Sequence, residues 1–335
     1  MMAEGQKRKK AILLIRMTGI VIFLFILYRL QARLIVSILL DSRLYFIPAI
    51  ILVYYCLLTL KLVRWISVFR FQGLRMGKLE SLKAYVYSSL IAAVTFGQAM
   101  DILKAYSLKR FGTTADSEKK SSLTIGETGV SVVIERLMEY GLFMLFALVG
   151  VLFILGQRNH SNLLYSLLIL IAIYTSMTYL FAFHSGKIFQ FLDRQGERVP
   201  RMLNWLIRNL RGLLSGLHHY PARGLLFPLF LTLIYLLGLG LADFLLAGCL
   251  SIDIPYLHFI FISPFISIAN MLPITVAGFG TRELAVIYCF SNYGISPERA
   301  IAFSLAYFSL SYLILLLLAL LLFLPQFFHR ETRAA

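Results

Sequence analysis

One stretch interrupts the apolar sequence around it: Asn270-Met-Leu-Pro273-Ile-Thr-Val-Ala-Gly278-Phe-Gly280-Thr-Arg282-Glu283. Proline removes a backbone donor and stops a helix, and two glycines separated by one residue favour a tight or left-handed backbone. The flanking residues 256–272 and 284–291 stay apolar, so the break and its Arg-Glu pair are expected at membrane depth. Broken backbone is tolerated there only where protein buries it or where it lines a wet cavity. We expect a broken or re-entrant element at a functional site; the alternative is a polar loop between two spans.

The composition excludes an ordinary soluble domain. Of the 335 residues, 59% are hydrophobic and only 14% are charged. Several apolar runs approach the roughly 20 residues that a helix needs to cross a bilayer, and they are continuous rather than alternating. We therefore predict an all-α polytopic membrane helix bundle that forms a single integral membrane domain over residues 1–335.

The basic residues indicate an orientation in the membrane. The net charge of +16 could suggest nucleic acid, but in a membrane protein Lys and Arg orient the loops by the positive-inside rule. Nucleic-acid binding is therefore not expected. In the predicted layout most basic residues face one side, and the outer side holds only Arg29, Arg33, Arg43, Arg158 and Arg299. This asymmetry predicts a multi-pass protein of the cytoplasmic (inner) membrane with both termini in the cytoplasm.

The apolar runs give a layout of six full spans and two broken or re-entrant elements. The full spans are expected at about 11–30, 44–63, 129–155, 163–183, 224–249 and 298–324. The broken elements are 84–103 and 256–293; if they cross the membrane, eight to nine spans result. Lys61, Arg64 and Trp65 are interpreted as an interfacial belt that ends the second span.

The first broken element is marked by Phe96-Gly97-Gln98-Ala99-Met100-Asp101, with basic loops on both sides. A re-entrant hairpin that enters and leaves on the inner side accounts for both basic loops. Phe96-Gly97-Gln98 also faintly echoes Phe279-Gly280-Thr281 of the second element. Two interrupted segments in corresponding positions are a pointer to a transport site.

The longest polar segment, 184–223, is basic and carries leucines at helical spacing. It is predicted to be a cytoplasmic basic amphipathic linker, with a helix over 201–217 that lies on the membrane surface or packs under the bundle.

The charged residues at membrane depth are the candidate site. Arg282 follows a glycine-rich turn and opens a helix, an arrangement that suits a phosphate. The alternative is a structural ion pair of Arg282 with Glu135, or of Glu283 with Arg136. Asp101 and Lys104 are three residues apart, and they are either site residues or an interfacial helix cap. Asp243 stands alone on its span, where a partner such as Arg136 or a proton relay is considered.

Enzyme and metal motifs were not found. The sequence has no zinc-binding His pattern, no nucleophile elbow and no phosphate-binding glycine loop. Cys56, Cys249 and Cys289 are far apart within apolar runs, so neither a metal site nor a disulfide framework is expected. We expect no cofactor and no enzyme activity. Glu135 and Glu139 share a helix face and are the only candidates for an integral-membrane transferase.

Three motifs carry a family resemblance. They are Asn270-Met-Leu-Pro273 with Gly278-Phe-Gly280-Thr-Arg282-Glu283 and Gly294-Ile-Ser-Pro-Glu-Arg-Ala300, then Glu135-Arg136-Leu137, and finally residues 96–106. Through these the chain resembles the lysylphosphatidylglycerol synthase transmembrane-region family of flippase-like membrane proteins, over about 11–324. The segment 96–106 departs from the family pattern Pro-Gly-Arg-x-Gly-Glu-x-x-Arg. It has Gln98 in place of the first arginine, so a positive charge is lost there. Asp101 and Lys104 replace the glutamate and the second arginine and keep their charges.

The resemblance implies a lipid translocase without the soluble aminoacyltransferase domain. The cargo would be a phospholipid or a polyprenyl-phosphate-linked lipid. Arg282, Arg136 and Lys104 would bind the headgroup or its phosphate, and Glu283, Glu135 and Asp101 would be their charge partners. The backbone would be shaped by Asn270, Pro273, Gly278, Gly280 and Gly97. Arg282→Gln is expected to abolish transport without preventing insertion.

A second hypothesis is a non-catalytic membrane subunit of an envelope lipid or glycan biosynthesis enzyme, docked through helix 201–217. Membrane lipids are the expected partners in the first case, an envelope-biosynthesis enzyme in the second, and a homo-oligomer is compatible with both.

Overall fold

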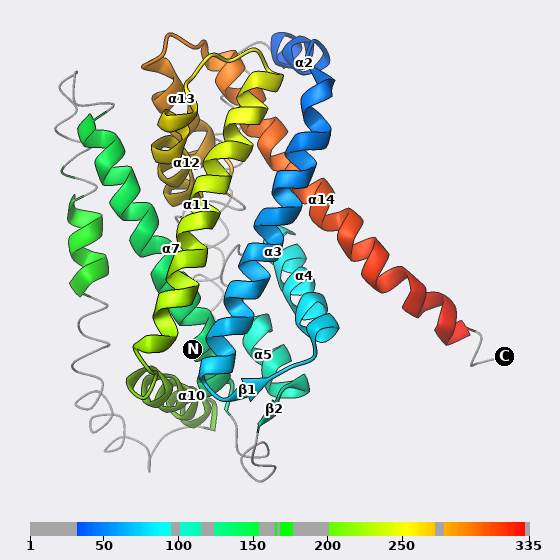
Figure 1. Ribbon diagram of the computed structural model, residues 1–335, viewed down its shortest axis with the longest axis vertical. Helices are drawn as coiled ribbons and strands as arrows, with labels where there is room; N and C mark the ends of the chain where they lie inside the picture. The colour runs from blue at the N-terminus through cyan, green and yellow to red at the C-terminus, as the bar shows by residue number, and fades with distance from the viewer. Residues whose placement is uncertain are drawn as a thin grey trace, which may run out of the picture.

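The computed structural model describes residues 32–94, 101–114, 124–153, 165, 168–176, 201–271 and 278–331. The predicted first span, 11–30, lies outside these residues, as does most of 163–183. Gly97 and Pro273 also lie outside them. Figure 1 shows the described part as a bundle of long helices that run along one axis.

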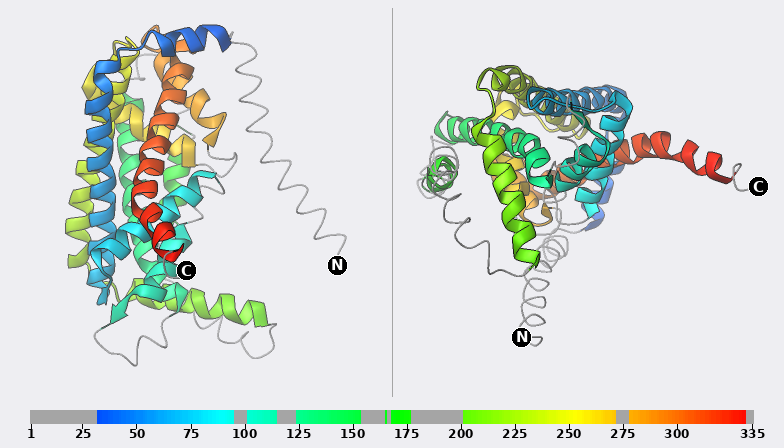
Figure 2. Two further views of the ribbon diagram at one scale, coloured as in Figure 1. Left: turned by 90° about the vertical axis from the view of Figure 1, so that its right-hand side faces the viewer. Right: turned by 90° about the horizontal axis from the view of Figure 1, so that it is seen from below.

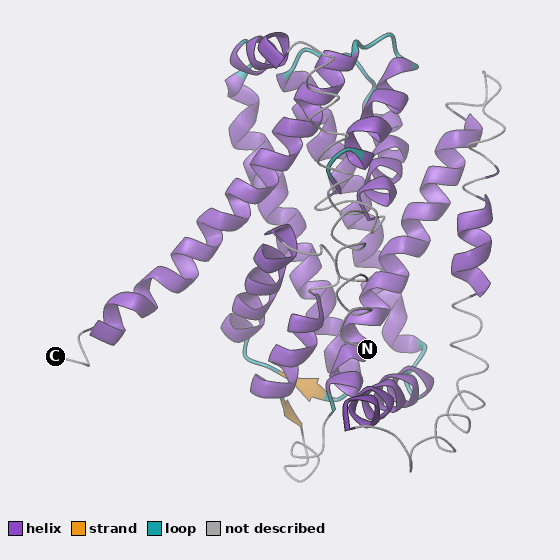
Figure 3. Ribbon diagram, turned by 180° about the vertical axis from the view of Figure 1, so that it is seen from behind, coloured by secondary structure: helices purple, strands orange, loops and turns teal. Residues whose placement is uncertain are grey.

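Nearly all of the described chain is helical, so the prediction of an all-α membrane helix bundle is confirmed. Figure 3 shows the helices together with one small pair of strands. The helices in chain order are α2 (Ala32–Leu40), η1 (Leu44–Phe46), α3 (Ile47–Phe71), α4 (Lys78–Val94), α5 (Ile102–Phe111), α7 (Ile125–Phe153), α10 (Arg201–His218), α11 (Arg223–Cys249), α12 (Tyr256–Met271), α13 (Thr281–Ser291) and α14 (Pro297–Glu331). The strands are β1 (Leu74–Arg75) and β2 (Thr113–Thr114).

Three described segments are long and apolar enough to cross a membrane: Leu44–Phe71, Arg223–Cys249 and Pro297–Phe323. They correspond to three of the predicted spans, and they support a multi-pass membrane protein. α7 has 29 residues and is therefore about 43 Å long, which exceeds the roughly 30 Å hydrocarbon core of a bilayer.

The beginning of α7 differs from its predicted boundary. Glu135, Arg136 and Glu139 were expected in the first turns of a span at 129–155, but α7 begins at Ile125, ten residues before Glu135. Thr124 and Glu127 explain the earlier start. The Glu127 backbone N–H donates to Thr124 Oγ1 at 3.1 Å, and the Thr124 backbone N–H donates to Glu127 Oε2 at 2.6 Å. This reciprocal pair is a capping box, which satisfies free donors at a helix N-terminus.

Both ends of the segment that holds α4 and α5 lie side by side. β1 precedes α4, β2 follows α5, and the strands pair antiparallel with Leu74 opposite Thr114 and Arg75 opposite Thr113. The chain therefore leaves the bundle end after α3, forms α4 and α5, and returns to its starting point. Residues 95–100, where the predicted break lies, are outside the described part.

α10 lies across the lower end of the bundle (Figures 1 and 2), packed against α7. Leu213 and Leu217 of α10 pack on Val130 and Ile134 of α7. Of the two placements considered from the sequence, the membrane surface or the underside of the bundle, the packing of one face of α10 against α7 favours the second.

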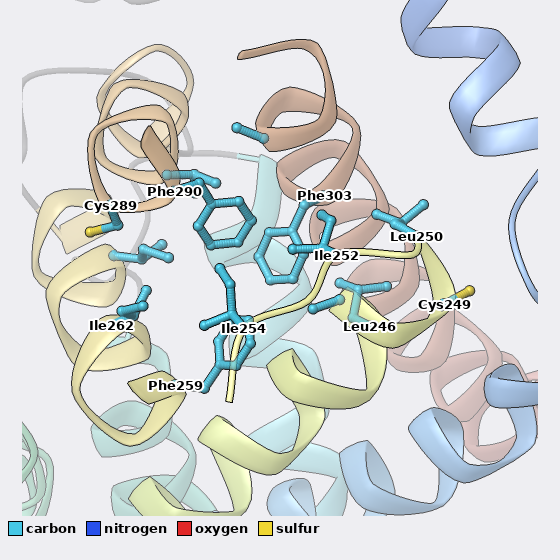
Figure 4. Close-up of a cluster of buried hydrophobic side chains, with 14 of the residues drawn as sticks. Leu246, Cys249, Leu250, Ile252, Ile254, Phe259, Ile262, Cys289, Phe290 and Phe303 are labelled. Atoms are coloured by element: carbon cyan, nitrogen blue, oxygen red, sulfur yellow. The ribbon is translucent and has the colours of Figure 1, made fainter. Parts of the chain in front are cut away.

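The largest buried cluster lies at the opposite end, between α11, α12, α13 and α14 (Figure 4). Phe259, Phe290 and Phe303 meet there, with the Phe290 and Phe303 ring centroids 5.0 Å apart. Between helices in a membrane such rings stabilise the packing through van der Waals contacts. The cluster holds α13 in place beyond the break that follows α12.

Candidate functional site

Charged side chains from α3, α5 and α7 form one connected network inside the bundle. Arg64 of α3 lies at its centre. Its Nη2 is 2.9 Å from Glu135 Oε1 and 2.7 Å from Glu139 Oε2, and its Nη1 donates to Thr232 Oγ1 of α11 at 3.2 Å. Lys61, one turn earlier on α3, reaches Glu139 Oε1 at 3.3 Å. Two cations of α3 are therefore bound to two carboxylates of α7.

The network continues from α7 to α5. Lys104 Nζ is 3.3 Å from Glu135 Oε2 and 3.1 Å from Asp101 Oδ1. Arg136 donates from Nε to Asp101 Oδ2 at 2.6 Å, and its Nη1 is 3.3 Å from Glu139 Oε2. The first broken element is thus joined to α7 through four buried or half-buried charges.

Burial and charge count define what this network can bind. Arg64, Lys104, Glu135 and Glu139 are at most 2% exposed in their side chains, whereas Arg136 is 20% exposed. The connected side chains comprise the cations Lys61, Arg64, Lys104 and Arg136 against the carboxylates Asp101, Glu135 and Glu139. One positive charge is therefore in excess within the described residues. Because buried charges are costly unless they are paired, an anion at this place would complete the balance.

Two sequence interpretations are wrong at this network. Arg64 and Trp65 were assigned to an interfacial belt, but both are at most 1% exposed. The reason is that α3 continues to Phe71, so that both side chains lie on the part of the helix that packs inside the bundle. Asp101 was considered as a helix cap; it stands at the N-cap of α5 but makes no side-chain cap hydrogen bond. Its carboxylate binds Lys104 and Arg136 instead. The apolar sequence after Arg64 is the signal that α3 continues.

A cavity of about 350 Å³ opens beside the network, between α5, α7 and α10. Arg136 and Asp101 line it together with largely apolar residues. The α7 lining residues include Gly129, Val132 and Arg136, which recur at helical spacing along one face. The cavity therefore presents an apolar wall and a charged pair to the same occupant, which is the pattern of an amphiphile site.

The second charged centre lies at the start of α13. Arg282 Nη2 is 2.6 Å from Glu283 Oε1, and both Arg282 Nε and Glu283 Oε1 bond Ser304 Oγ of α14 at 2.8 Å. Arg282 and Glu283 are at most 1% exposed. Arg282 does form a structural ion pair, the alternative considered from the sequence, but its partner is Glu283 and not Glu135, and Glu283 does not pair with Arg136.

Glycines shape the turn before Arg282 as predicted. Gly278 and Gly280 have φ of +74° and +88°, a region that L side chains rarely adopt. A Cβ on Gly278 would also collide with the side chain of Asn270, the residue near the end of α12. The backbone-shaping role predicted for these three residues agrees with their geometry.

The predicted site residues thus fall into two groups. Arg136, Lys104, Glu135 and Asp101 share the α3–α5–α7 network, while Arg282 and Glu283 form their own centre. No ion pair joins the two groups among the described residues. Sequence reasoning missed Arg64, Lys61 and Glu139 as members of the site network, although it had noted Glu139 on the face of Glu135.

The family assignment is decided by the length of the match. The chain matches the family described as lysylphosphatidylglycerol synthase TM region over residues 11–319. It belongs to this family. The matched part of the chain includes every residue of the two charged centres. Membership places the protein among membrane proteins of lipid metabolism or translocation. No curated protein and no solved structure gives a significant match.

Proposed function

We propose that the protein is a lipid translocase whose cargo carries a phosphate on its headgroup: a phospholipid or a polyprenyl-phosphate-linked lipid of the cytoplasmic membrane. The observation that carries the proposal is the cavity between α5, α7 and α10, which places Arg136 at the edge of an unbalanced buried network and beside an apolar wall. Membership in the lysylphosphatidylglycerol synthase TM family supports the choice of a lipid over other amphiphiles.

The headgroup would meet Arg136 first. Its guanidinium is the most exposed among the cations that line or border the cavity, and a guanidinium binds phosphate oxygens in a bidentate manner. Its present partner Asp101 also holds Lys104, so Asp101 keeps a cation when Arg136 turns to a phosphate. The acyl or prenyl chain would lie along Val132, Val133 and Leu213.

The α4–α5 segment would then be a re-entrant hairpin. The strand pair β1–β2 supports this part of the proposal, because it brings the two ends of the segment to one face of the bundle. The polar residues Asp101 and Lys104 would be carried by this hairpin to membrane depth, where α7 supplies Glu135 and Arg136 as partners.

A reconstitution experiment tests the proposal. Purified protein in vesicles would be supplied with a fluorescent phospholipid or a labelled polyprenyl phosphate, and movement between leaflets would be followed by quenching from outside. Arg136→Gln is expected to abolish movement, while Arg110→Gln, a substitution of an exposed arginine on α5, should leave it intact. Arg136→Gln should still fold, because Arg136 is partly exposed, Asp101 keeps Lys104, and Glu139 keeps Lys61 and Arg64.

Two results would contradict the proposal. Full activity of Arg136→Gln would show that Arg136 does not bind the headgroup. Failure of the folded wild-type protein to move any of these lipids would favour the non-catalytic subunit of an envelope biosynthesis enzyme. Arg282→Gln forms a further arm of the experiment, since Arg282 was expected from the sequence to bind the headgroup, yet it is enclosed by Glu283 and Ser304.

A further inference from the structure

Asp243 is a buried carboxyl that the proposed lipid site does not use. It lies on α11, inside the membrane-length segment Arg223–Cys249, and is 3% exposed. Its oxygen Oδ1 has no hydrogen-bond partner. None of the ion pairs between described residues includes Asp243. Arg136, considered from the sequence as its partner, is bound to Asp101 and Glu139 instead.

Hydroxyl groups from the neighbouring helices surround this carboxyl. Ser263 of α12 lies beside it and interacts with the carboxyl through its hydroxyl. Tyr54 of α3 and Tyr307 of α14 interact with it electrostatically, and their ring centroids are 6.3 Å apart. Tyr235, two turns earlier on α11, is the remaining titratable neighbour. Four helices therefore meet around one carboxyl and several hydroxyls.

The chemistry of this place selects a proton over a metal ion. A carboxylate without a cation is unfavourable inside a membrane, and taking up a proton removes its charge. A metal ion would need several oxygen ligands, whereas Asp243 is the only carboxylate at this place among the described residues. α11 continues unbroken through Asp243, so the backbone carbonyls there are engaged in the helix. Among the described residues no group of three His, Cys, Asp or Glu side chains could hold a metal.

Asp243 is also linked to the second broken element, through the side chain of Tyr307. Tyr307 interacts electrostatically with both Asp243 and Arg282. Arg282 opens α13 directly after the turn at Gly278 and Gly280. A change of charge at Asp243 would therefore change the electrostatic potential at Arg282, next to the turn of the second broken element.

We propose that Asp243 binds and releases a proton and thereby couples lipid movement to a proton gradient across the membrane. This inference rests on the proposed translocase function. The step forms one O–H bond on the Asp243 carboxylate, with the proton taken from water on one side, and breaks it again with release to the other side. No other bond and no electron transfer is involved, so the gradient is the energy source.

The test uses the full chain in vesicles that carry a fluorescent anionic phospholipid, with and without an imposed pH difference. In the wild type, one polarity of the gradient should accelerate lipid movement several-fold over the reverse polarity. Asp243→Asn should respond to neither polarity. Asp253→Asn, which changes an exposed aspartate in the turn after α11, should behave as the wild type.

The outcomes separate this inference from the proposed function. Lipid movement that ignores the gradient in the wild type, or a gradient response that survives in Asp243→Asn, overturns the coupling and leaves the translocase intact. Absence of all lipid movement overturns the translocase, and with it the coupling. The proton site itself is then read by infrared spectroscopy of the purified protein at neutral pH. A protonated-carboxyl band that disappears in Asp243→Asn establishes proton binding, and its absence from the wild type refutes it.

Discussion

Arg64→Met should destabilise the protein strongly although it removes no residue of the lipid cavity. Arg64 is 1% exposed and binds Glu135 and Glu139 at 2.9 and 2.7 Å. Removing one partner of a buried ion pair costs about 3–5 kcal/mol, because the other charge is left without compensation. Lys61, Lys104 and Arg136 remain close to the carboxylates, so we expect about 3 kcal/mol, at the lower end of that range.

The assay is thermal unfolding of the purified protein in detergent, followed by the fluorescence of its tryptophans. A loss of about 3 kcal/mol corresponds to roughly 4 °C in the midpoint for a chain of this size. Arg70→Met on the exposed last turn of the same helix is the matched control and should stay within about 1 °C of the wild type.

A double substitution distinguishes lost charge balance from lost packing. Glu139→Gln in the Arg64→Met background removes the carboxylate that has lost its nearest cation, so part of the lost stability should return. If Arg64→Met alone melts within about 1 °C of the wild type, the network contributes nothing to the fold and the reasoning from buried charge is refuted. If the double variant is less stable than Arg64→Met by a further large step, packing rather than charge is the cause.

Three further predictions concern backbone contacts, all measured by thermal unfolding. Gly278→Ala should lower the stability of the protein more than Gly73→Ala does. Both glycines have a positive φ, which costs an alanine about 1–2 kcal/mol, but only at Gly278 would the added Cβ also collide with the Asn270 side chain. Equal losses of stability in the two variants would contradict this contact. Gly126→Ala should cost about 1–3 kcal/mol because its Cβ meets the backbone of α10, whereas Gly129→Ala has ordinary contacts and serves as control. Thr124→Ala should cost about 1 kcal/mol through the lost cap of α7, and an unchanged midpoint would show that the cap is not needed.

The helices were predictable from the sequence because the length of an apolar run is a local property. The spans at 224–249 and 298–324 correspond to α11 and α14, and the amphipathic pattern of 201–217 corresponds to α10. The turn at Gly278 and Gly280 was predictable for the same reason, since a glycine acts on its own backbone. Helix ends were less predictable: α3 and α7 continue beyond their predicted limits through polar residues that become buried between helices.

The pairing of charges was not predictable, because it depends on which helices approach each other. Arg64 could be assigned to an interface only as long as its helix was thought to end there. Arg282 and Glu283 show a second reason. Adjacent residues on a helix do not normally face each other, so a distant partner was expected for each. Here Glu283 turns back to accept a hydrogen bond from the Gly280 N–H at 2.6 Å, which brings its other oxygen to Arg282.

The two charged centres have different consequences for a bound anion. At α13 one arginine faces one glutamate, a serine hydroxyl completes the pair, and the rings of Phe279 and Phe308 flank the guanidinium. An anion there would have to displace Glu283 from both Arg282 and the helix start. At α7 a surplus cation stands beside a cavity, and an anion that takes Arg136 from Asp101 would leave Asp101 paired with Lys104. An arginine next to a glutamate therefore fixes the backbone at Arg282, whereas at Arg136 it leaves the guanidinium partly exposed beside the cavity.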